Sequence, residues 1–481
     1  MAIIRNSVFA SLGSLVPFAV TIITLPLLIR AIGMEAYGVL AISWLILVYV
    51  GQADFGLSRA VSHRIAALRA DVEGTEANIA GTARTAVALG AAAGLMTGFC
   101  AAIIAAIYFR LFFEADTIGI ETLAVPAIIG AATALVTMLG VFFGLLIGEE
   151  RFREMAAIVM TVNSLQQLLP LAVALLWSTD IAALLAATLL ARLTGVVWAA
   201  GKTARLTQQA APISMTVARA LTGYGKWVMA ATVTKPVLTV ADRFIIGAQM
   251  GPVAVAAYAV PYQIASRTQM VPQAISNVLF PRFTALSEAD AADAARLAVL
   301  AMAAVSAPFY IALTVLSAPA LSLWLGQELD PRSLALARIL LVAFWIAGLG
   351  LTASVFLQAR NDPRFVALWT GLQIPLYIAA LLVCGYLYGL IGIALAFLAR
   401  TLLESGVLLM RAGLFDRALC LRVTPMALLL VAAAVIGGSA TGWALVLWTA
   451  VLASVGLAVA VLALPATLRR RLTGILALRR R

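Results

Sequence analysis

The sequence predicts an all-α polytopic membrane protein, with about fourteen transmembrane helices in two pseudo-symmetric six-helix lobes followed by two C-terminal helices. Three observations predict this fold class. Of the 481 residues, 63% are hydrophobic and 11% are charged, and the mean hydropathy is +1.05, which excludes a soluble globular domain. The apolar residues gather in runs of about 20, the length that crosses a bilayer as a helix. The positive charges fall mainly in alternate connections between these runs.

Fourteen apolar runs are long enough to span the membrane, and short connections rich in Gly, Pro or charge separate them. The first run follows Arg5 and is too long for the apolar part of a cleaved signal peptide, so it is expected to remain as a span. The predicted spans are 7–29, 38–58, 85–109, 123–147, 155–177, 181–200, 226–248, 253–280, 296–318, 333–357, 365–384, 388–410, 424–441 and 443–465.

The distribution of Lys and Arg predicts the orientation. With the N-terminus in the cytoplasm, 24 of the 33 Lys and Arg residues fall in cytoplasmic segments, three on the opposite side and six within spans. This asymmetry predicts that both termini are cytoplasmic and that the number of spans is even. The net charge of +12 is therefore a topology signal, with some attraction to anionic lipid headgroups, and does not indicate nucleic-acid binding.

A weak internal repeat accompanies this topology. An offset of 218 residues pairs Gly33 with Gly251 and Thr21 with Thr239. Six helices separate the paired segments, so both halves are expected to start in the cytoplasm and to be related by an axis along the membrane normal. Transporters with such repeats carry their substrate site near the midplane. The predicted parts are an N-terminal lobe at 1–212, a C-terminal lobe at 213–422, and 423–481 with two further helices and a basic tail. The segment 201–225 is expected to link the lobes.

The candidate site lies in the segment from 226 to 282, where two apolar spans carry ionisable residues. A charge at the centre of a bilayer helix costs about 2.5–3.5 kcal/mol on insertion scales, so such residues are expected to face a bundle interior or a wet cavity. At helical spacing they form two polar stripes. The first stripe is Thr232, Lys235, Thr239 and Asp242, next to Arg243, and the second is Gln263, Ser266, Arg267, Gln273 and Asn277. The alternative is a structural Lys–Asp pair that only joins the helices.

Polar residues in the first half extend this prediction. Asn163 and Gln166 in the fifth span are candidates for lining the cavity, although such residues also serve as helix–helix contacts in membranes. Asp54, near the end of the second span, is a third candidate, and its alternative roles are a helix cap or a partner for Arg59. Arg400 and Glu404 are one turn apart and are expected to form an ion pair.

The sequence offers no catalytic constellation. The single histidine, His63, lies beside arginines at the expected headgroup level, and the three cysteines are widely separated in apolar segments. There is no P-loop, no nucleophile-elbow motif and no zinc-ligand spacing. We therefore predict a protein that is not an enzyme and uses no cofactor and no metal. A membrane glycosyltransferase, the rival from another class, would require a sizeable catalytic loop, and the longest predicted loop on the non-cytoplasmic side is 110–122.

Three segments of the chain combine Gly, Pro, Tyr and Asp with apolar sequence. They are RNSVFASLGSLVPFAVTIITLPLLIRAIGMEAYGVLAISWLI near the N-terminus, the DFGL that starts at Asp54, and ADRFIIGAQMGPVAVAAYAVPYQI with the later NVLFPRF. Together they resemble the polysaccharide-exporting flippases, a family that includes the O-antigen and capsule repeat-unit flippases of bacteria. The wider superfamily includes the lipid II flippase and the multidrug and toxic compound extrusion antiporters. The resemblance implies two six-helix lobes facing across a central cavity, and alternating access. It also implies a multi-pass protein of the bacterial inner membrane in O-antigen, capsule or exopolysaccharide synthesis.

The implied cargo is an undecaprenyl-diphosphate-linked oligosaccharide moved from the cytoplasmic to the periplasmic leaflet. Its diphosphate requires cations, which Lys235, Arg243 and Arg267 supply. Lys235 is about 13 Å deep from the cytoplasmic face and Arg267 about 9 Å deep, so we expect both to contact a phosphate. The implied partners are membrane lipids, H⁺ or Na⁺ as a coupling ion, and the polysaccharide polymerase machinery. A lipid II flippase stays open as an alternative. A cation-coupled drug antiporter would favour an acidic cavity, whereas six Lys or Arg lie within the predicted spans.

Overall fold

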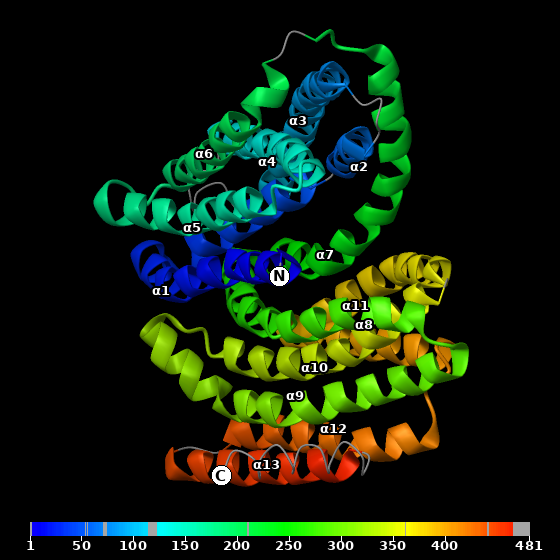
Figure 1. Ribbon diagram of the computed structural model, residues 1–481. Helices are drawn as coiled ribbons and strands as arrows, with labels where there is room; N and C mark the ends of the chain where they lie inside the picture. The colour runs from blue at the N-terminus through cyan, green and yellow to red at the C-terminus, as the bar shows by residue number, and fades with distance from the viewer. Residues whose placement is uncertain are drawn as a thin grey trace, which may run out of the picture. The chain divides into compact units, whose positions relative to one another are not determined.

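The structure is a computed structural model that describes residues 2–52, 54, 56–70, 75–113, 123–208, 211–360, 362–439 and 442–464. The side chains of 2–12, 14, 224–236 and 363 are outside this description. Within the described ranges the secondary structure consists of thirteen α-helices and one short 3₁₀ helix, and there is no strand (Figure 1). The predicted all-α fold class is confirmed.

Unit 1 comprises Met1–Ala256 and forms a compact helical unit. Its helices, blue to green in Figure 1, pack in an ordered set of pairs: α3 on α4, α1 on α5, α5 on α6, and α4 on both α2 and α6. A buried core of Val, Leu, Ile, Phe and Ala side chains joins α2, α3, α4, α5 and α6. The helices are α1 (Ala2–Gly51), α2 (Leu57–Ala70), α3 (Glu76–Phe112), α4 (Ala124–Gly148), α5 (Phe152–Leu176), α6 (Ile181–Thr207) and most of α7 (Met215–Arg267).

Unit 2 comprises Ala257–Arg481, so the boundary between the units falls inside α7. In this unit α10 packs against α8, α9 and α11, and α12 and α13 both pack against α9 (Figure 1, green to red). Its elements after α7 are α8 (Met270–Ala285), α9 (Glu288–Leu325), η2 (Gly326–Glu328), α10 (Arg332–Ala359), α11 (Pro363–Arg411), α12 (Arg417–Ser439) and α13 (Gly442–Ala463).

Three long helices are broken by a glycine with positive φ. Gly33 in α1 has φ 81° and ψ 166°, Gly251 in α7 has φ 78° and ψ 179°, and Gly389 in α11 has φ 61° and ψ −144°. Glycine has no Cβ and adopts these angles without the steric cost that other residues meet. Gly33 and Gly251 are the pair that the 218-residue offset aligned, and they share nearly the same backbone angles. The sequence repeat is therefore present in the backbone at this position.

The order and length of the helices also repeat. The helices α1, α2, α3 and α4 contain 50, 14, 37 and 25 residues, and α7, α8, α9 and α10 contain 53, 16, 38 and 28. The pair α5 and α6 corresponds to α11, in which Gly389 separates two helical segments. Among the described residues of the first half, no helices correspond to α12 and α13. The lobe boundaries predicted at 1–212 and 213–422 follow this repeat and stay a prediction.

Eleven helices of the described part are long and apolar enough to cross a membrane, so the chain is a multi-pass membrane protein. The three helices with a central glycine each contain two apolar segments. If each of these crosses twice, the number of spans rises from eleven to fourteen, and the predicted count stays a prediction.

Two predicted connections are largely helical. The predicted cytoplasmic segment 59–84 contains α2 and the start of α3, because Leu57, Val61 and Ile65 give α2 an apolar face that packs in the unit 1 core. In the predicted linker 201–225, α6 extends to Thr207 and α7 begins at Met215. The hydropathy of the sequence did not reveal α2, ended α6 too early and began α7 too late. The reason is that charged residues lower the mean hydropathy of any window that contains them.

Candidate functional site

The central pair of the predicted site, Asp242 and Arg243, is buried in α7 within unit 1. Asp242 is 0% exposed and Arg243 is 5% exposed. The Arg243 Nε atom lies 4.0 Å from Asp242 Oδ1, and the Arg243 backbone N–H donates to the same oxygen at 2.8 Å. Arg243 Nη1 also donates to the Thr239 carbonyl at 3.1 Å. Asp242 therefore has the adjacent arginine as a counter-charge, and each charge makes hydrogen bonds within its own helix.

The part of α7 that carries this pair is held closely against α3 and α1. The Tyr108 hydroxyl of α3 donates to the Phe244 carbonyl at 2.8 Å, next to the glycine at 247. In α1, Gly38 lies directly against the Pro252 backbone, because a Cβ at Gly38 would be 1.9 Å from the Pro252 carbonyl oxygen. These contacts fix the position of Asp242 and Arg243 inside unit 1.

The second predicted stripe is divided between two helices of unit 2. Gln263 and Arg267 lie on α7, which ends at Arg267, whereas Gln273 and Asn277 lie on α8. Gln263 and Arg267 are partly buried. Gln273 and Asn277 are exposed and joined by a hydrogen bond of 3.3 Å. The expectation of one continuous helix over 253–280 is wrong, since a turn at Thr268 and Gln269 interrupts it.

Side chains from neighbouring helices stabilise this turn. Gln269 Nε2 donates to the Phe344 carbonyl of α10 at 2.5 Å and lies 3.3 Å from the Tyr310 hydroxyl of α9. The Tyr310 hydroxyl donates to Thr268 Oγ1. Sequence reasoning missed Gln269 and Tyr310. The available signal was Pro272, which is tolerated in the first turn of a helix and so suggests that a new helix begins just before it.

Asp54 occupies the corresponding break in unit 1, between α1 and α2. Its carboxylate oxygens accept from the backbone N–H groups of Gly56 at 2.9 Å and Ser58 at 3.0 Å. Asp54 thus caps the N-terminus of α2, which is one of the alternatives that the sequence left open. Among the described residues, no ion pair within 4.0 Å joins it to Arg59.

The two candidates of the fifth span lie on α5, one turn apart. Gln166 is 8% exposed, and its Oε1 accepts a hydrogen bond from Arg192 Nη2 of α6. Asn163 is partly buried. Gln166 therefore has an arginine partner inside unit 1 that the sequence analysis did not assign to it.

The predicted residues are divided between the two compact units of the chain. Unit 1 contains the group Asp54, Asn163, Gln166, Asp242 and Arg243, and unit 2 contains Gln263, Arg267, Gln273 and Asn277. The Lys235 side chain lies outside the described residues. The expected approach of Lys235 to Arg267 stays a prediction.

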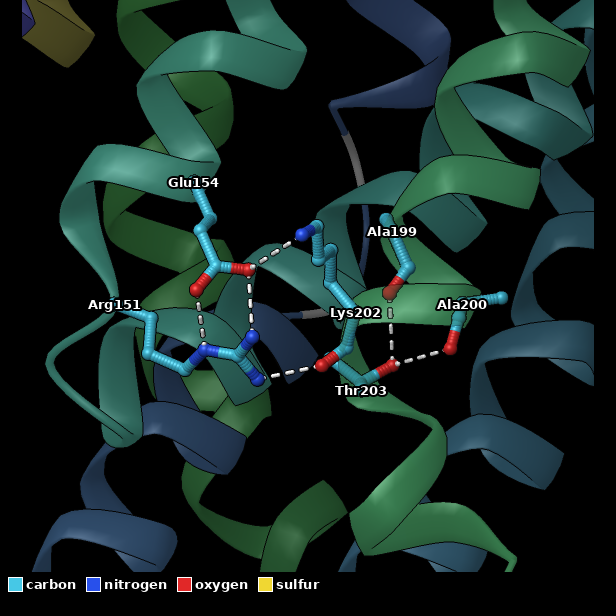
Figure 2. A network of polar contacts seen from close by, with 6 residues as sticks. All are labelled: Arg151, Glu154, Ala199, Ala200, Lys202 and Thr203. Carbon is cyan, nitrogen blue, oxygen red and sulfur yellow. Dashed lines mark hydrogen bonds and ion pairs between the residues drawn. The ribbon is translucent and has the colours of Figure 1, made fainter.

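A separate charged network joins the start of α5 to the end of α6. Figure 2 shows Arg151 bound to the Glu154 carboxylate through Nε at 2.8 Å and Nη2 at 2.6 Å, while its Nη1 donates to the Lys202 carbonyl. Lys202 Nζ lies 3.8 Å from Glu154. These side chains are about one-third to one-half exposed, and such pairs position helix ends with a small effect on stability. Within the described residues, no three His, Cys, Asp or Glu side chains are grouped to hold a metal ion.

Comparison with known proteins supports the fold and gives the family. A curated protein of Shigella flexneri named "Putative O-antigen transporter" is 24% identical over 410 residues, which covers 84% of this chain and 96% of that protein. A solved inward-facing multidrug resistance MATE family transporter of the MOP superfamily has a TM-score of 0.66 at 14% identity, covering 87% of this chain and 98% of that one. The lipid II flippase MurJ in an inward closed conformation has a TM-score of 0.63 at 14% identity, covering 94% and 97%.

The structural matches show that the fold is that of the MATE and MurJ transporters, as the resemblance implied. The sequence match to a family is longer than half of the chain. The family described as "Polysaccharide biosynthesis protein" matches residues 3–287, which include the whole first half, the kink at Gly251 and the Asp242–Arg243 pair. The chain belongs to this polysaccharide biosynthesis protein family.

Proposed function

We propose that the protein is a flippase of the bacterial inner membrane that moves an undecaprenyl-diphosphate-linked oligosaccharide from the cytoplasmic to the periplasmic leaflet. The assembled unit would serve the synthesis of O-antigen, capsule or exopolysaccharide. The family membership and the MATE- and MurJ-like fold support a transporter of this kind. Both termini are proposed to lie in the cytoplasm.

The observation that carries the proposal is the sign of the charges inside the apolar helices. Within the predicted spans lie five cations besides Arg192, against the carboxylates Asp54, Asp242 and Glu404. Asp54 caps α2, and the other two carboxylates lie beside an arginine, since Arg400 Nη1 is 2.9 Å from Glu404 and Arg243 is adjacent to Asp242. The five cations are Lys235, Arg243, Arg267, Arg338 and Arg400. An excess of cations at membrane depth favours an anionic cargo, such as a lipid diphosphate.

In this proposal Lys235, Arg243 and Arg267 bind the diphosphate during transport. Charge-assisted hydrogen bonds to phosphate oxygens are about twice as strong as neutral ones, and they replace the hydration that the diphosphate loses at membrane depth. Gln263, Gln273 and Asn277 offer amides to the glycan, while the polyprenyl tail stays in lipid. Alternating access of two lobes would then expose the bound headgroup first to one leaflet and then to the other.

Two other cargoes are compatible with the same fold. A lipid II flippase would also require cations for a diphosphate, and the MurJ likeness gives it structural support. A cation-coupled drug antiporter is disfavoured by the excess of arginine over carboxylate. A membrane glycosyltransferase is disfavoured because the solved proteins with this fold are transporters.

The direct test is flipping of a labelled undecaprenyl-diphosphate oligosaccharide in vesicles that contain the purified protein. We expect Lys235→Ala and Arg267→Ala to abolish flipping while the protein still inserts, and Lys235→Arg to keep part of the rate because the charge remains. Arg422→Ala removes an exposed arginine of α12 and is the matched control, with an unchanged rate. A Lys235→Ala, Arg267→Ala double variant that flips at the normal rate would exclude this site.

A deletion strain separates a flippase from a transferase. A flippase defect should leave complete lipid-linked units on the cytoplasmic leaflet, whereas truncated units would indicate a transferase.

Ion coupling of transport is tested by Asp242→Asn. If Asp242 carries H⁺ or Na⁺, this variant should lose gradient-driven flipping and still bind the lipid-linked substrate. Normal transport would show that Asp242 is only a counter-charge for Lys235 or Arg243.

A further inference from the structure

Arg192 is an arginine in the middle of α6 with no opposite charge beside it. It is 7% exposed, and it lies about 17 Å from the start of α6 and about 22 Å from its end at 1.5 Å per residue. Its Nη2 donates to the neutral amide of Gln166. Its Nε is buried and has no hydrogen-bond partner among the described residues. Arginine keeps its proton in proteins, so the charge remains.

No carboxylate of the described residues forms an ion pair with Arg192. The acidic residues outside the described part are few, and in the sequence they belong to the connections 71–74 and 114–122. The segment 224–236, whose side chains are not described, contains no Asp or Glu. The other buried arginine of unit 1, Arg243, has Asp242 next to it. Arg192 thus differs from Arg243 in having no described counter-charge. A buried charge without a counter-charge strongly destabilises a fold.

The surroundings of Arg192 are polar on one side. Asn163 lies one turn before Gln166 on α5. One turn before Arg192 on α6, the Thr188 hydroxyl accepts a hydrogen bond of 3.1 Å from the Trp44 indole of α1. Neutral polar groups of α5 and α6 therefore lie at helical spacing beside a fixed positive charge inside unit 1.

We propose that Arg192 binds a small inorganic anion, such as chloride, inside unit 1. The anion would neutralise the guanidinium and accept its remaining N–H groups, and Asn163 would offer a further amide donor. This site differs from the proposed cargo site, and it does not depend on the proposed function. Its role would be to stabilise the packing of α1, α5 and α6 by supplying a counter-charge that the described chain does not provide.

The test is the thermal stability of the purified protein when gluconate is replaced by chloride or bromide at constant ionic strength. A ligand that binds only the folded state raises the melting temperature in proportion to the logarithm of its concentration above Kd. We expect the wild-type Tm to rise by a few degrees in either halide. Arg192→Met should lose this response, and Arg338→Met, which removes a partly exposed arginine of unit 2, should keep it.

Gln166→Glu is the decisive variant, since it places a carboxylate at the hydrogen-bond partner of Arg192. It should match or exceed the wild-type Tm in gluconate and show no halide response, and it remains informative if Arg192→Met does not fold. Equilibrium binding of labelled chloride should give about one ion per chain in the wild type and none in Gln166→Glu. The proposal is overturned if wild-type stability is the same in gluconate and halide, or if Gln166→Glu responds to halide like the wild type.

Discussion

The two halves of the chain repeat the same helices, but the polar contacts that join corresponding helix ends differ in which helix supplies the charged side chain. In the first half, Arg69 at the end of α2 donates to the Glu149 carboxylate at the C-terminus of α4, at 2.7 Å. In the second half, Arg360 at the C-terminus of α10 donates to the Leu286 carbonyl at the end of α8, at 3.2 Å. The ends of α2 and α4 correspond to the ends of α8 and α10. The arginine donor lies on α2 in the first half, but it follows α10, the counterpart of α4, in the second.

The joint at the next pair of helix ends shows the same reversal. Before α5, Arg151 is the cationic residue and contacts the Lys202 carbonyl near the end of α6 (Figure 2). Before α11, Asp362 is the anionic residue and pairs with Arg411 at the end of α11, at 2.7 Å. Either polarity satisfies a helix end, so the backbone repeat persists while the residues diverge. Such divergence at corresponding helix ends contributes to the weakness of the repeat in the sequence.

The largest expected difference between the halves is at Gly38 and its counterpart at the same offset, Ala256. A Cβ at Gly38 would lie 1.9 Å from the Pro252 carbonyl oxygen, a contact that the backbone must move to relieve. Ala256 is fully buried and already has a Cβ. We expect Gly38→Ala to prevent folding or lower Tm sharply, and Ala256→Gly to cost about 1 kcal/mol. Thermal unfolding in detergent measures both, and equal effects would show that α1 and α7 pack alike.

The second difference concerns the two breaks that follow the first helical segments. Gln269→Ala leaves the Phe344 carbonyl and the Tyr310 hydroxyl without this partner, at a cost of about 1–3 kcal/mol. Asp54→Ala removes a helix cap, at a cost of about 0.5–2 kcal/mol. Gln52→Ala, an exposed glutamine beside the first break, is the control and should leave Tm unchanged. A larger effect of Asp54→Ala than of Gln269→Ala would contradict the ranking.

A third difference tests the reversed charges at the helix ends. A double-mutant cycle of Asp362→Ala and Arg411→Ala should give a coupling of about 0.2–1 kcal/mol, because the pair is partly exposed. A cycle of Arg151→Ala and Glu154→Ala should give a similar value. Both couplings should fall at high salt. A coupling in one half that is several times that in the other would show that the two joints are not equivalent.

The smallest expected effect is a pH dependence from Asp330, at the start of α10 in the second half. Asp330 precedes α10 and accepts from Arg332, which lowers the pKa of Asp330 below its ordinary value. Because the folded-state pKa is depressed, this stabilisation is complete above the unfolded pKa of about 4 and is lost as pH falls through the folded pKa. Residue 123, which precedes α4, makes no such cap. Asp330→Asn should reduce the acid dependence of Tm by a small amount, and an unchanged acid dependence would assign it to other groups.

The sequence by itself determined the fold class, the apolar segments and the glycine pair of the repeat. These features follow from properties of single residues and short windows: apolar length sets a span, and only glycine readily adopts the positive φ of Gly33 and Gly251. It also determined that Lys and Arg outnumber Asp and Glu within the predicted spans, which supports the proposed anionic cargo. Composition and spacing are sufficient for such features because they do not depend on which helices meet.

Only the tertiary structure decided the partners of the polar side chains. Gln166 is the acceptor of Arg192, Gln269 joins a turn to α10, and Asp54 caps α2, and each contact depends on a break or a neighbour that no window of sequence contains. Helical spacing predicted one stripe from Gln263 to Asn277, but the turn at Thr268 and Gln269 divides it. The physical reason is that side-chain periodicity assumes an unbroken helix, whereas contacts with α9 and α10 stabilise the break.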